Sequence, residues 1–386
     1  MSSTVKIHYD CDNYYASVEE RFAPHLKTVP FAVCGDPDMR HSIVMSKNSI
    51  AKKAGVITGI SFRQAKQICP NLAYVKADMA KYLAQAKIIR NIARKYSDII
   101  TPYGIDESWI DLGKLTFNEG MQIAELIRIE IMYSLGLSAS LGVSFNHIFS
   151  KIGSDYRKPN TVTVITHDNY KDIVWALPVS HMLFVGGRRM KILQSAGIMT
   201  IGDIARADPI LLGRLLGKVG NDLHRYANGD DSNFKPNADN INSLGNTITP
   251  PADLRTNSDV GAILYLLSTT VCARLKKHGL KTTCISLHMR DSEFNKVTRQ
   301  KSFGIGTDSV NYMFNQAYTL FTKHYKWKRP VRSLGLRAEG LDKMEQLTLF
   351  PVDDCEPVVN VDARVKQLTS QYGELRVEES PFIKGC

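Results

Sequence analysis

Two acidic clusters, about a hundred residues apart, place the strongest constraint on how this chain can fold. The first is Asp10-Cys11-Asp12, which follows the alternating apolar run Val5–Tyr9; the second is Asp106-Glu107, which precedes the apolar run Trp109–Leu112. Carboxylates at strand ends repel one another unless a positive charge neutralises them. Their oxygen atoms favour Mg²⁺ or Ca²⁺ over zinc. We therefore predict a metal site built from both clusters, with solvated turn acids as the alternative.

The length and composition indicate a multidomain protein outside the membrane. A chain of 386 residues suggests about two to four domains. No segment is long and apolar enough to span a bilayer, and the N-terminus has no signal-peptide pattern. The seven cysteines include no C-x-x-C pair, so they indicate neither a disulfide framework nor a zinc site. We expect a monomer in a reducing cytoplasm.

The charge is distributed unevenly along the chain. The whole chain carries a net charge of +11, of which residues 241–344 hold +9, while residues 345–386 hold −4. A basic module of this kind favours a polyanion as partner, and nucleic acid is the natural one. A well-solvated basic surface is the alternative, and the charge alone does not decide between them.

Hydrophobic periodicity divides the chain into five parts. Residues 1–165 alternate strand and helix patterns, and residues 166–236 form short helices joined by Gly-containing turns. Residues 237–244 form a polar linker. Residues 245–344 show a helix-strand-strand-helix-strand pattern, and residues 345–386 form an acidic tail. The predicted fold class is α+β with several domains.

Two glycine turns and several basic strand residues are candidates for DNA contact. The turns around Gly186 and Gly217 each open a probable helix next to a cation, Arg188 or Lys218, which suits backbone N–H contacts to phosphate. Such a pair of turns is typical of a helix-hairpin-helix module, although ordinary helix-helix turns explain each one nearly as well. In the basic module, strand alternation would place part of the basic residues on one face. The candidates there are Arg290, Arg299, Lys301 and Arg332.

The acidic clusters have the composition of a two-metal site for phosphoryl chemistry. Asp10, Asp106 and Glu107 could hold two Mg²⁺ ions, and the main-chain carbonyl of Cys11 could add a further oxygen. No Walker-type glycine loop occurs, so a triphosphate would depend on scattered side chains. Ser46, Lys52 and Lys158 are candidates for that role, and for the two lysines a solvated surface charge is the alternative.

Several motifs together resemble one protein family. Asp10-x-Asp12-x-Tyr14-Tyr15-Ala16-Ser17-Val18-Glu19, Ser46-x-Asn48-x-x-Ala51-Lys52 and Ile105-Asp106-Glu107-Ser108 look like the Y family of translesion DNA polymerases. So do Leu141-Gly142-Val143-Ser144-x-Asn146 and Ser154-Asp155-x-x-Lys158-Pro159, and the bacterial DNA polymerase IV group is the most similar branch. The resemblance covers nearly the whole chain. It implies a right-hand polymerase with a palm, small fingers over about 20–75, a helical thumb and an α/β little finger.

The resemblance also implies roles for individual residues. The metal ligands would be Asp10, Asp106, Glu107 and the Cys11 carbonyl, with two Mg²⁺ ions per site. Tyr15 would be the steric gate that excludes a 2′-hydroxyl, where plain core packing is the alternative.

Further positions map to the substrate. Those that would contact the triphosphate are Ser46, Lys52 and Lys158. Those that would line the roof over the nascent base pair are Gly35, Met45 and Gly59. Many relatives have Tyr-x-Ala-Arg where this chain has Ser49-Ile50-Ala51-Lys52, which removes a bidentate phosphate contact. Met45 is also bulkier than usual, and His147 stands where a Lys is common.

A short motif follows the basic module. Residues Gln346, Leu347, Leu349 and Phe350, within Gln346-Leu347-Thr348-Leu349-Phe350, resemble the peptide with which bacterial polymerases dock onto the replication sliding clamp. Five-residue matches are weak, but the position between a basic module and an acidic tail favours this interpretation.

The expected function is a template-directed, low-fidelity DNA polymerase for translesion synthesis. It would use primer-template DNA and dNTP and release pyrophosphate, without a proofreading domain. The alternative is a catalytically weak DNA-binding accessory protein at stalled forks, which the Ser49 and Lys52 departures motivate. A nucleotidyl cyclase would explain the carboxylates but neither the basic module nor the clamp-like peptide.

Overall fold

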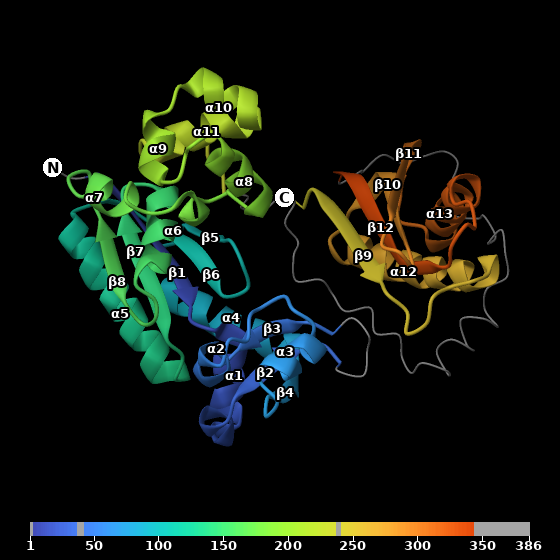
Figure 1. Ribbon diagram of the computed structural model, residues 1–386, viewed down its shortest axis with the longest axis horizontal. Helices are drawn as coiled ribbons and strands as arrows, with labels where there is room; N and C mark the ends of the chain where they lie inside the picture. The colour runs from blue at the N-terminus through green and yellow to red at the C-terminus, as the bar shows by residue number, and fades with distance from the viewer. Residues whose placement is uncertain (1–2, 37–41, 237–240, 343–386) are drawn as a thin grey trace. The chain divides into compact units, whose positions relative to one another are not determined.

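The computed structural model describes residues 3–36, 42–236 and 241–342 and divides into two compact units (Figure 1). The first unit is Met1–Ala238 and the second is Asp239–Cys386. Each unit has its own hydrophobic core, and each is described by itself. Within the described residues, no helix combines the length and apolarity that a membrane span requires.

The first unit is built on a mixed five-stranded sheet with the strand order β5-β6-β1-β7-β8. The central strand β1 is antiparallel to both β6 and β7, while β7 and β8 are parallel. The strands are β1 (Ser3–Cys11), β5 (Ile100–Pro102), β6 (Glu107–Leu115), β7 (Ala139–Ser144) and β8 (Val162–Ile165).

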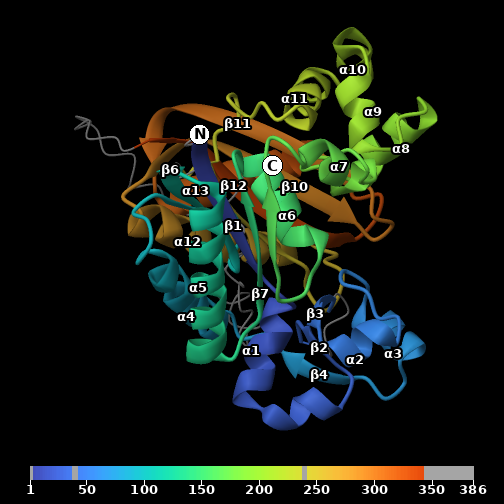
Figure 2. The same ribbon diagram turned by 90° about the vertical axis from the view of Figure 1, so that its left-hand side faces the viewer.

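Strand alternation gives β1 two different faces. Val5, Ile7 and Tyr9 point into an apolar core with helices α4 (Met79–Ala93) and α5 (Phe117–Leu135). The side chains between them point to the opposite face, which helix α6 (His147–Tyr156) covers (Figure 2). The predicted strand at the first acidic cluster is therefore present, and its two faces have different chemistry.

A smaller module follows the first helix of the chain. Its sheet has the order β3-β2-β4 and packs its own core against two short helices. The first helix is α1 (Tyr14–Phe22), and the elements that follow it are the 3-10 helix η1 (Pro24–Thr28), β2 (Phe31–Cys34), β3 (Val44–Lys47), α2 (Ser49–Lys53), α3 (Phe62–Ile68) and β4 (Ala73–Lys76). This module lies in the range expected for the fingers.

The short helices predicted over 166–236 are present and share a core with α6. They are α7 (Tyr170–Val174), the 3-10 helix η2 (Val179–His181), α8 (Gly187–Ser195), α9 (Ile201–Arg206), α10 (Pro209–Leu216) and α11 (Lys218–Ala227). Helices α10 and α11 meet at Gly220, where a Cβ atom would lie 2.0 Å from the Leu212 carbonyl oxygen. Only glycine permits this close approach.

The second unit is an antiparallel sheet with two helices packed on one face. The strand order is β11-β10-β12-β9. The elements are β9 (Ser243–Ile248), α12 (Asn257–Lys277), β10 (Lys281–Asp291), β11 (Lys296–Thr307), α13 (Val310–His324) and β12 (Val331–Asp342). The sequence pattern gave no strand before the first helix, yet β9 begins inside the range expected as linker. Its Gly245 and Asn246 have low strand propensity, so pairing with β12 decides its conformation.

Candidate active site

The antiparallel pairing of β1 with β6 brings the two acidic clusters together. Asp10 lies directly opposite Glu107 in the register. The Cys11 amide donates to the Asp106 carbonyl oxygen at 3.2 Å, and the Tyr103 and Gly104 amides donate to the Glu107 carbonyl oxygen. Residues separated by about a hundred positions thus form one cluster at the end of two paired strands.

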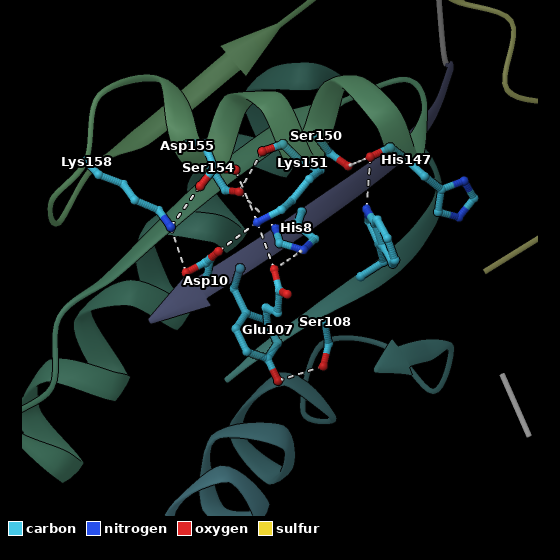
Figure 3. A network of polar contacts seen from close by, with 12 residues as sticks. His8, Asp10, Glu107, Ser108, His147, Ser150, Lys151, Ser154, Asp155 and Lys158 are labelled. Atoms are coloured by element: carbon cyan, nitrogen blue, oxygen red, sulfur yellow. Dashed lines mark hydrogen bonds and ion pairs between the residues drawn. The ribbon is translucent and has the colours of Figure 1, made fainter. Parts of the chain in front are cut away.

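Two lysines from one region of the chain neutralise this cluster (Figure 3). Lys151 Nζ lies 2.7 Å from Asp10 Oδ2, 2.8 Å from Glu107 Oε2 and 3.2 Å from Asp155 Oδ2. Lys158 Nζ lies 2.7 Å from Asp10 Oδ1 and 2.8 Å from Asp155 Oδ1. Both oxygens of the Asp10 carboxylate are therefore ion-paired.

A fully buried histidine lies beneath the cluster (Figure 3). His8 Nδ1 is 2.9 Å from Ser154 Oγ, and His8 Nε2 is 3.4 Å from Glu107 Oε2. Burial and the charge of Lys151 lower the pKa of His8 well below its usual value, so its imidazole is neutral.

The carboxylates differ in their electrostatics. Burial raises the pKa of Asp10, but the ion pairs with Lys151 and Lys158 outweigh it and lower that pKa to about 2. Burial, together with the charges of Asp10 and Glu107, raises the pKa of Asp106 to about 7. The negatively charged form of Asp106 is therefore disfavoured, because burial and its acidic neighbours outweigh the cations around it.

This donor set suits a hard divalent cation. Three carboxylates and the main-chain carbonyl oxygen of Cys11 are ligands of the kind that Mg²⁺ prefers, and a cation there would relieve the crowding at Asp106. In the described part of the chain, no three His, Cys, Asp or Glu side chains are arranged so that they could hold a metal ion as they stand. The ammonium group of Lys151 bridges two of the carboxylates instead, so these oxygens fit a metal ion once the lysine moves away.

Asp12, the remaining acid of the first cluster, has a structural role. It is buried and accepts hydrogen bonds from Ser140 Oγ and from the Asn160 amide, both at 2.9 Å. These bonds tie the turn after Lys158 to the end of β1.

The predicted gate residue Tyr15 lies beside the carboxylates in an aromatic cluster. Its ring is 4.6 Å from the ring of Tyr82 and 5.7 Å from that of Tyr14. Burial and the charge of Asp106 raise the pKa of Tyr15 to about 12. Tyr14 is the buried partner, because its hydroxyl donates to the Tyr82 carbonyl oxygen.

The predicted phosphate-binding side chains lie in different surroundings. Lys158 is in the carboxylate cluster, and Lys52 is exposed on α2. Ser46 points inward from β3, and its hydroxyl donates to the Asn13 carbonyl oxygen at 3.2 Å. Alternation along β3 places Met45 and Lys47 on the other side of that strand.

The residues expected over the nascent base pair belong to the β2-β3 module. Gly35 follows β2, and the Gly59 amide donates to the Val44 carbonyl oxygen of β3 with a φ of 92° at Gly59. Lys47, which no sequence motif singled out, lies next to them, and its Nζ donates to Thr58 Oγ1 at 2.9 Å beside Gly59.

The two glycine turns differ from neighbouring helix starts in one respect. Gly186 caps α8 and Gly217 caps α11, in both cases without a side-chain hydrogen bond. In contrast, Thr200 caps α9 and Asp208 caps α10 through their side chains. Arg188 and Lys218 lie in the first turns of α8 and α11. The amide groups of these two helices are thus left open to an anion.

The register of the second sheet separates the basic residues that the sequence analysis grouped. Arg299 pairs with Leu287 and Lys301 with Ile285, so both leave β11 on the helix-covered side. Arg332 lies over the Phe294 ring, 4.6 Å from its centre.

Arg290, in contrast to Arg299 and Lys301, is on the open face. It shares this face with Lys296, its partner in β11, and with Arg337 of β12.

The clamp-like residues Gln346, Leu347, Leu349 and Phe350 lie outside the described residues. The sequence analysis also missed His8 and Lys151. A signal for Lys151 was present, because it is four residues before Asp155 and seven before Lys158, a spacing that places all three on one side of a helix. No sequence spacing of this kind marks His8, which occupies an ordinary position in the alternating strand pattern.

Comparison with known proteins identifies the family. Residues 9–155 match the impB/mucB/samB family, and residues 241–349 match the C-terminal domain of that family. DNA polymerase IV of Acetivibrio thermocellus is 40% identical over 98% of this chain and 98% of that protein. DNA polymerase IV of Pelotomaculum thermopropionicum is 32% identical over 95% of this chain and 92% of that protein.

Solved structures give the same answer for the fold. A Y-family DNA polymerase chimera of Dbh and Dpo4 matches with a TM-score of 0.79 and 25% identity, covering 87% of this chain and 98% of that one. This confirms the predicted α+β, right-hand polymerase architecture. The chain belongs to the impB/mucB/samB family, which places it among the Y-family DNA polymerases, in their DNA polymerase IV branch.

Proposed function

We propose that this protein is a template-directed DNA polymerase that carries out translesion synthesis. It joins a deoxynucleotide to a primer 3′-hydroxyl and releases pyrophosphate, with low fidelity. The observation that carries the proposal is the β1-β6 register, which sets Asp10 opposite Glu107 and next to Asp106. Full-length similarity to DNA polymerases IV supports it and does not favour the accessory-protein or cyclase alternatives.

We propose that the site binds two divalent metal ions and that these ions are Mg²⁺. Asp10, Asp106, Glu107 and the Cys11 carbonyl oxygen would hold them. When bound, such ions stabilise the attacking and the leaving oxygen of an in-line displacement.

The remaining chemistry comes from the chain itself. Lys158, once released from Asp10, can donate charge-assisted hydrogen bonds to a triphosphate. We propose the same contact for Lys52, and a place at the phosphates for Ser46. Gly35, Met45 and Gly59 would form the roof over the base pair.

Primer extension tests the polymerase proposal directly. A primer-template should be extended by wild-type protein with Mg²⁺ and dNTP, and the Asp106→Ala/Glu107→Ala variant should lose more than about a thousandfold in rate. The same variant should retain DNA binding, because the basic surfaces are untouched. Extension by that variant at the wild-type rate would rule out the mechanism.

We propose that Tyr15 is the gate against ribonucleotides. Packing against Tyr82 holds its ring next to the carboxylates, where it would meet a 2′-hydroxyl. Tyr15→Ala should incorporate ribonucleotides, while Tyr15→Phe, which keeps the ring, should exclude them. Equal sugar discrimination in all three proteins would remove this assignment.

We propose that DNA is held at two kinds of surface. The open helix starts at Gly186 and Gly217, with Arg188 and Lys218, would bind phosphates of the backbone. In the second unit, Arg290 lies on the open sheet face, while Arg299, Lys301 and Arg332 would act from its margin.

We also propose that Gln346–Phe350 docks onto a sliding clamp and that the protein acts as a cytoplasmic monomer. Five described cysteines are unpaired and buried, which is consistent with a reducing compartment. Deleting Gln346–Phe350 should abolish stimulation by the clamp and spare basal extension. Stimulation that survives the deletion would show that the motif is coincidental.

A further inference from the structure

Lys151 is the most constrained cation of the catalytic cluster. Its ammonium group contacts Asp10 Oδ2, Glu107 Oε2 and Asp155 Oδ2 at 2.7, 2.8 and 3.2 Å (Figure 3). Only 13% of its side chain is exposed. Burial alone would lower the pKa of Lys151, but the charges of Asp10 and Glu107 raise it above its usual value.

The backbone that carries Lys151 is fixed to the sheet. Helix α6 lies so close to β7 that a Cβ atom on Gly142 would be 2.0 Å from the Ser150 carbonyl oxygen. Ser154 Oγ donates to the Lys151 carbonyl oxygen at 2.8 Å and contacts His8 of β1 at 2.9 Å. The packing of α6 against β7 and β1 therefore directs the ammonium group of Lys151 at the carboxylates.

The oxygens that Lys151 occupies are those that would bind metal. Asp10 and Glu107 face each other across β1 and β6, and their charges repel because both side chains are largely buried. Removing a cation that bridges two buried like charges is strongly destabilising. A metal ion and Lys151 must therefore compete for the same two oxygens.

Asp155 offers an alternative anchor for the displaced lysine. It lies four residues after Lys151 on the same helix, and its two oxygens already contact Lys151 and Lys158. Its side chain is 42% exposed, so it can hold both ammonium groups without a further burial penalty.

We propose that Lys151 is a positioning residue that serves as the counter-cation of the catalytic carboxylates. In the metal-free protein, its ammonium group holds Asp10 and Glu107 in place. When a metal ion binds, Lys151 gives up their oxygens, and Asp155 retains the displaced ammonium group. This inference rests on the proposed function, because it takes Asp10 and Glu107 as metal ligands.

Metal binding in the absence of DNA and nucleotide tests the inference. We expect Lys151→Met to lower the melting temperature of the metal-free protein and to bind Mn²⁺ about tenfold more tightly than wild type, since the competing charge is gone. A residue that merely shapes the site would give the opposite sign, with weaker Mn²⁺ binding. Mn²⁺ affinity is measured by electron paramagnetic resonance, and melting temperature by circular dichroism with and without Mn²⁺.

Three variants serve as controls. Lys151→Arg keeps the charge and should restore wild-type Mn²⁺ affinity. Asp155→Asn removes the alternative anchor and should weaken Mn²⁺ binding several-fold. Lys95→Met removes a lysine that pairs with Glu130 away from the site and should change nothing.

Wild-type or weaker Mn²⁺ affinity in Lys151→Met would overturn the inference. If that variant is unfolded without metal, recovery of its melting transition on adding Mn²⁺ supports the inference, and failure to recover contradicts it. Primer extension by wild-type protein is scored separately, so failure of the proposed polymerase activity is distinguishable from failure at Lys151.

Discussion

The charged groups of the palm sheet (β5-β6-β1-β7-β8) and those of the little-finger sheet (β11-β10-β12-β9) are arranged in opposite ways. In the palm, Asp10, Glu107 and Lys151 are largely buried, and each contacts at least one opposite charge. On the little-finger sheet, Lys296 and Arg337 are exposed on the open face, and no ion pair within the described residues engages them.

This difference follows from what each surface has to do. Buried charges interact strongly and tolerate little displacement, so the palm positions a few atoms accurately. Exposed cations interact weakly with protein but release counterions when they meet a phosphate backbone. Changes in the palm should therefore act on stability and rate, whereas changes in the little finger should act on salt-dependent affinity.

The largest effect is expected where α6 meets the palm sheet. In Gly142→Ala, the new Cβ would lie 2.0 Å from the Ser150 carbonyl oxygen and 2.5 Å from the Ser154 amide nitrogen. We expect a loss of about 3 kcal/mol or more in the free energy of unfolding, measured by urea denaturation. Gly187→Ala is the matched control, because nothing lies within 4 Å of its Cβ position. Equal stability of the two variants would show that α6 can move off the sheet.

A smaller effect, on rate rather than stability, is expected at Gly104. A Cβ there would lie 2.9 Å from Glu107 Cγ and 3.0 Å from Glu107 Oε1, so that carboxylate must shift. Gly104→Ala should reduce kcat for primer extension about a hundredfold and leave the Kd for DNA unchanged. Gly304→Ala in β11, with nothing within 4 Å of the added Cβ, should alter neither. A wild-type kcat in Gly104→Ala would contradict the need for an exact Glu107 position.

Little-finger cations should change affinity alone. Arg290→Ala, Lys296→Ala and Arg337→Ala should each weaken DNA binding several-fold and reduce the slope of log K against log salt by about 1. Lys277→Ala, at the end of α12, is the control and should leave the slope unchanged. The measurement is fluorescence anisotropy across a salt series, together with kcat at saturating DNA. If these variants lowered kcat and left the salt slope unchanged, the open face of the sheet would not be a DNA-binding surface.

The smallest effect concerns a carboxylate of the little finger. Hydrogen bonds from the Asn295 side chain and from the Asn295 and Glu293 amides lower the pKa of Asp291 below its usual value. A lowered pKa stabilises the fold above the unfolded-state pKa, near 4, and this contribution disappears as the pH falls through the folded-state pKa. Asp291→Asn should therefore be less stable than wild type at pH 7 and nearly equal to it in strong acid. Urea denaturation at both pH values measures this, and a difference that grows in acid would contradict it.

Local patterns predicted much of this molecule. The alternation of Val5, Ile7 and Tyr9 gave the strand that carries Asp10, and the glycines at 186 and 217 marked two helix starts. Sequence patterns failed to predict the conformation of a strand, or the face that its side chains occupy, where pairing with another strand decides it. Strand β9 has weak propensity of its own, and the side from which Arg299 and Lys301 leave β11 depends on their register with β10.

By itself, the sequence determined which residue types could bind metal and which strands would carry them, because strand periodicity and carboxylate chemistry are local properties. The tertiary structure decided that Asp10 and Glu107 face each other, that His8 is buried beneath them and that Lys151 occupies their oxygens. The reason is physical: the charge balance of a buried site depends on every group within a few ångströms, and these groups come from β1, β6 and α6, which only folding brings together.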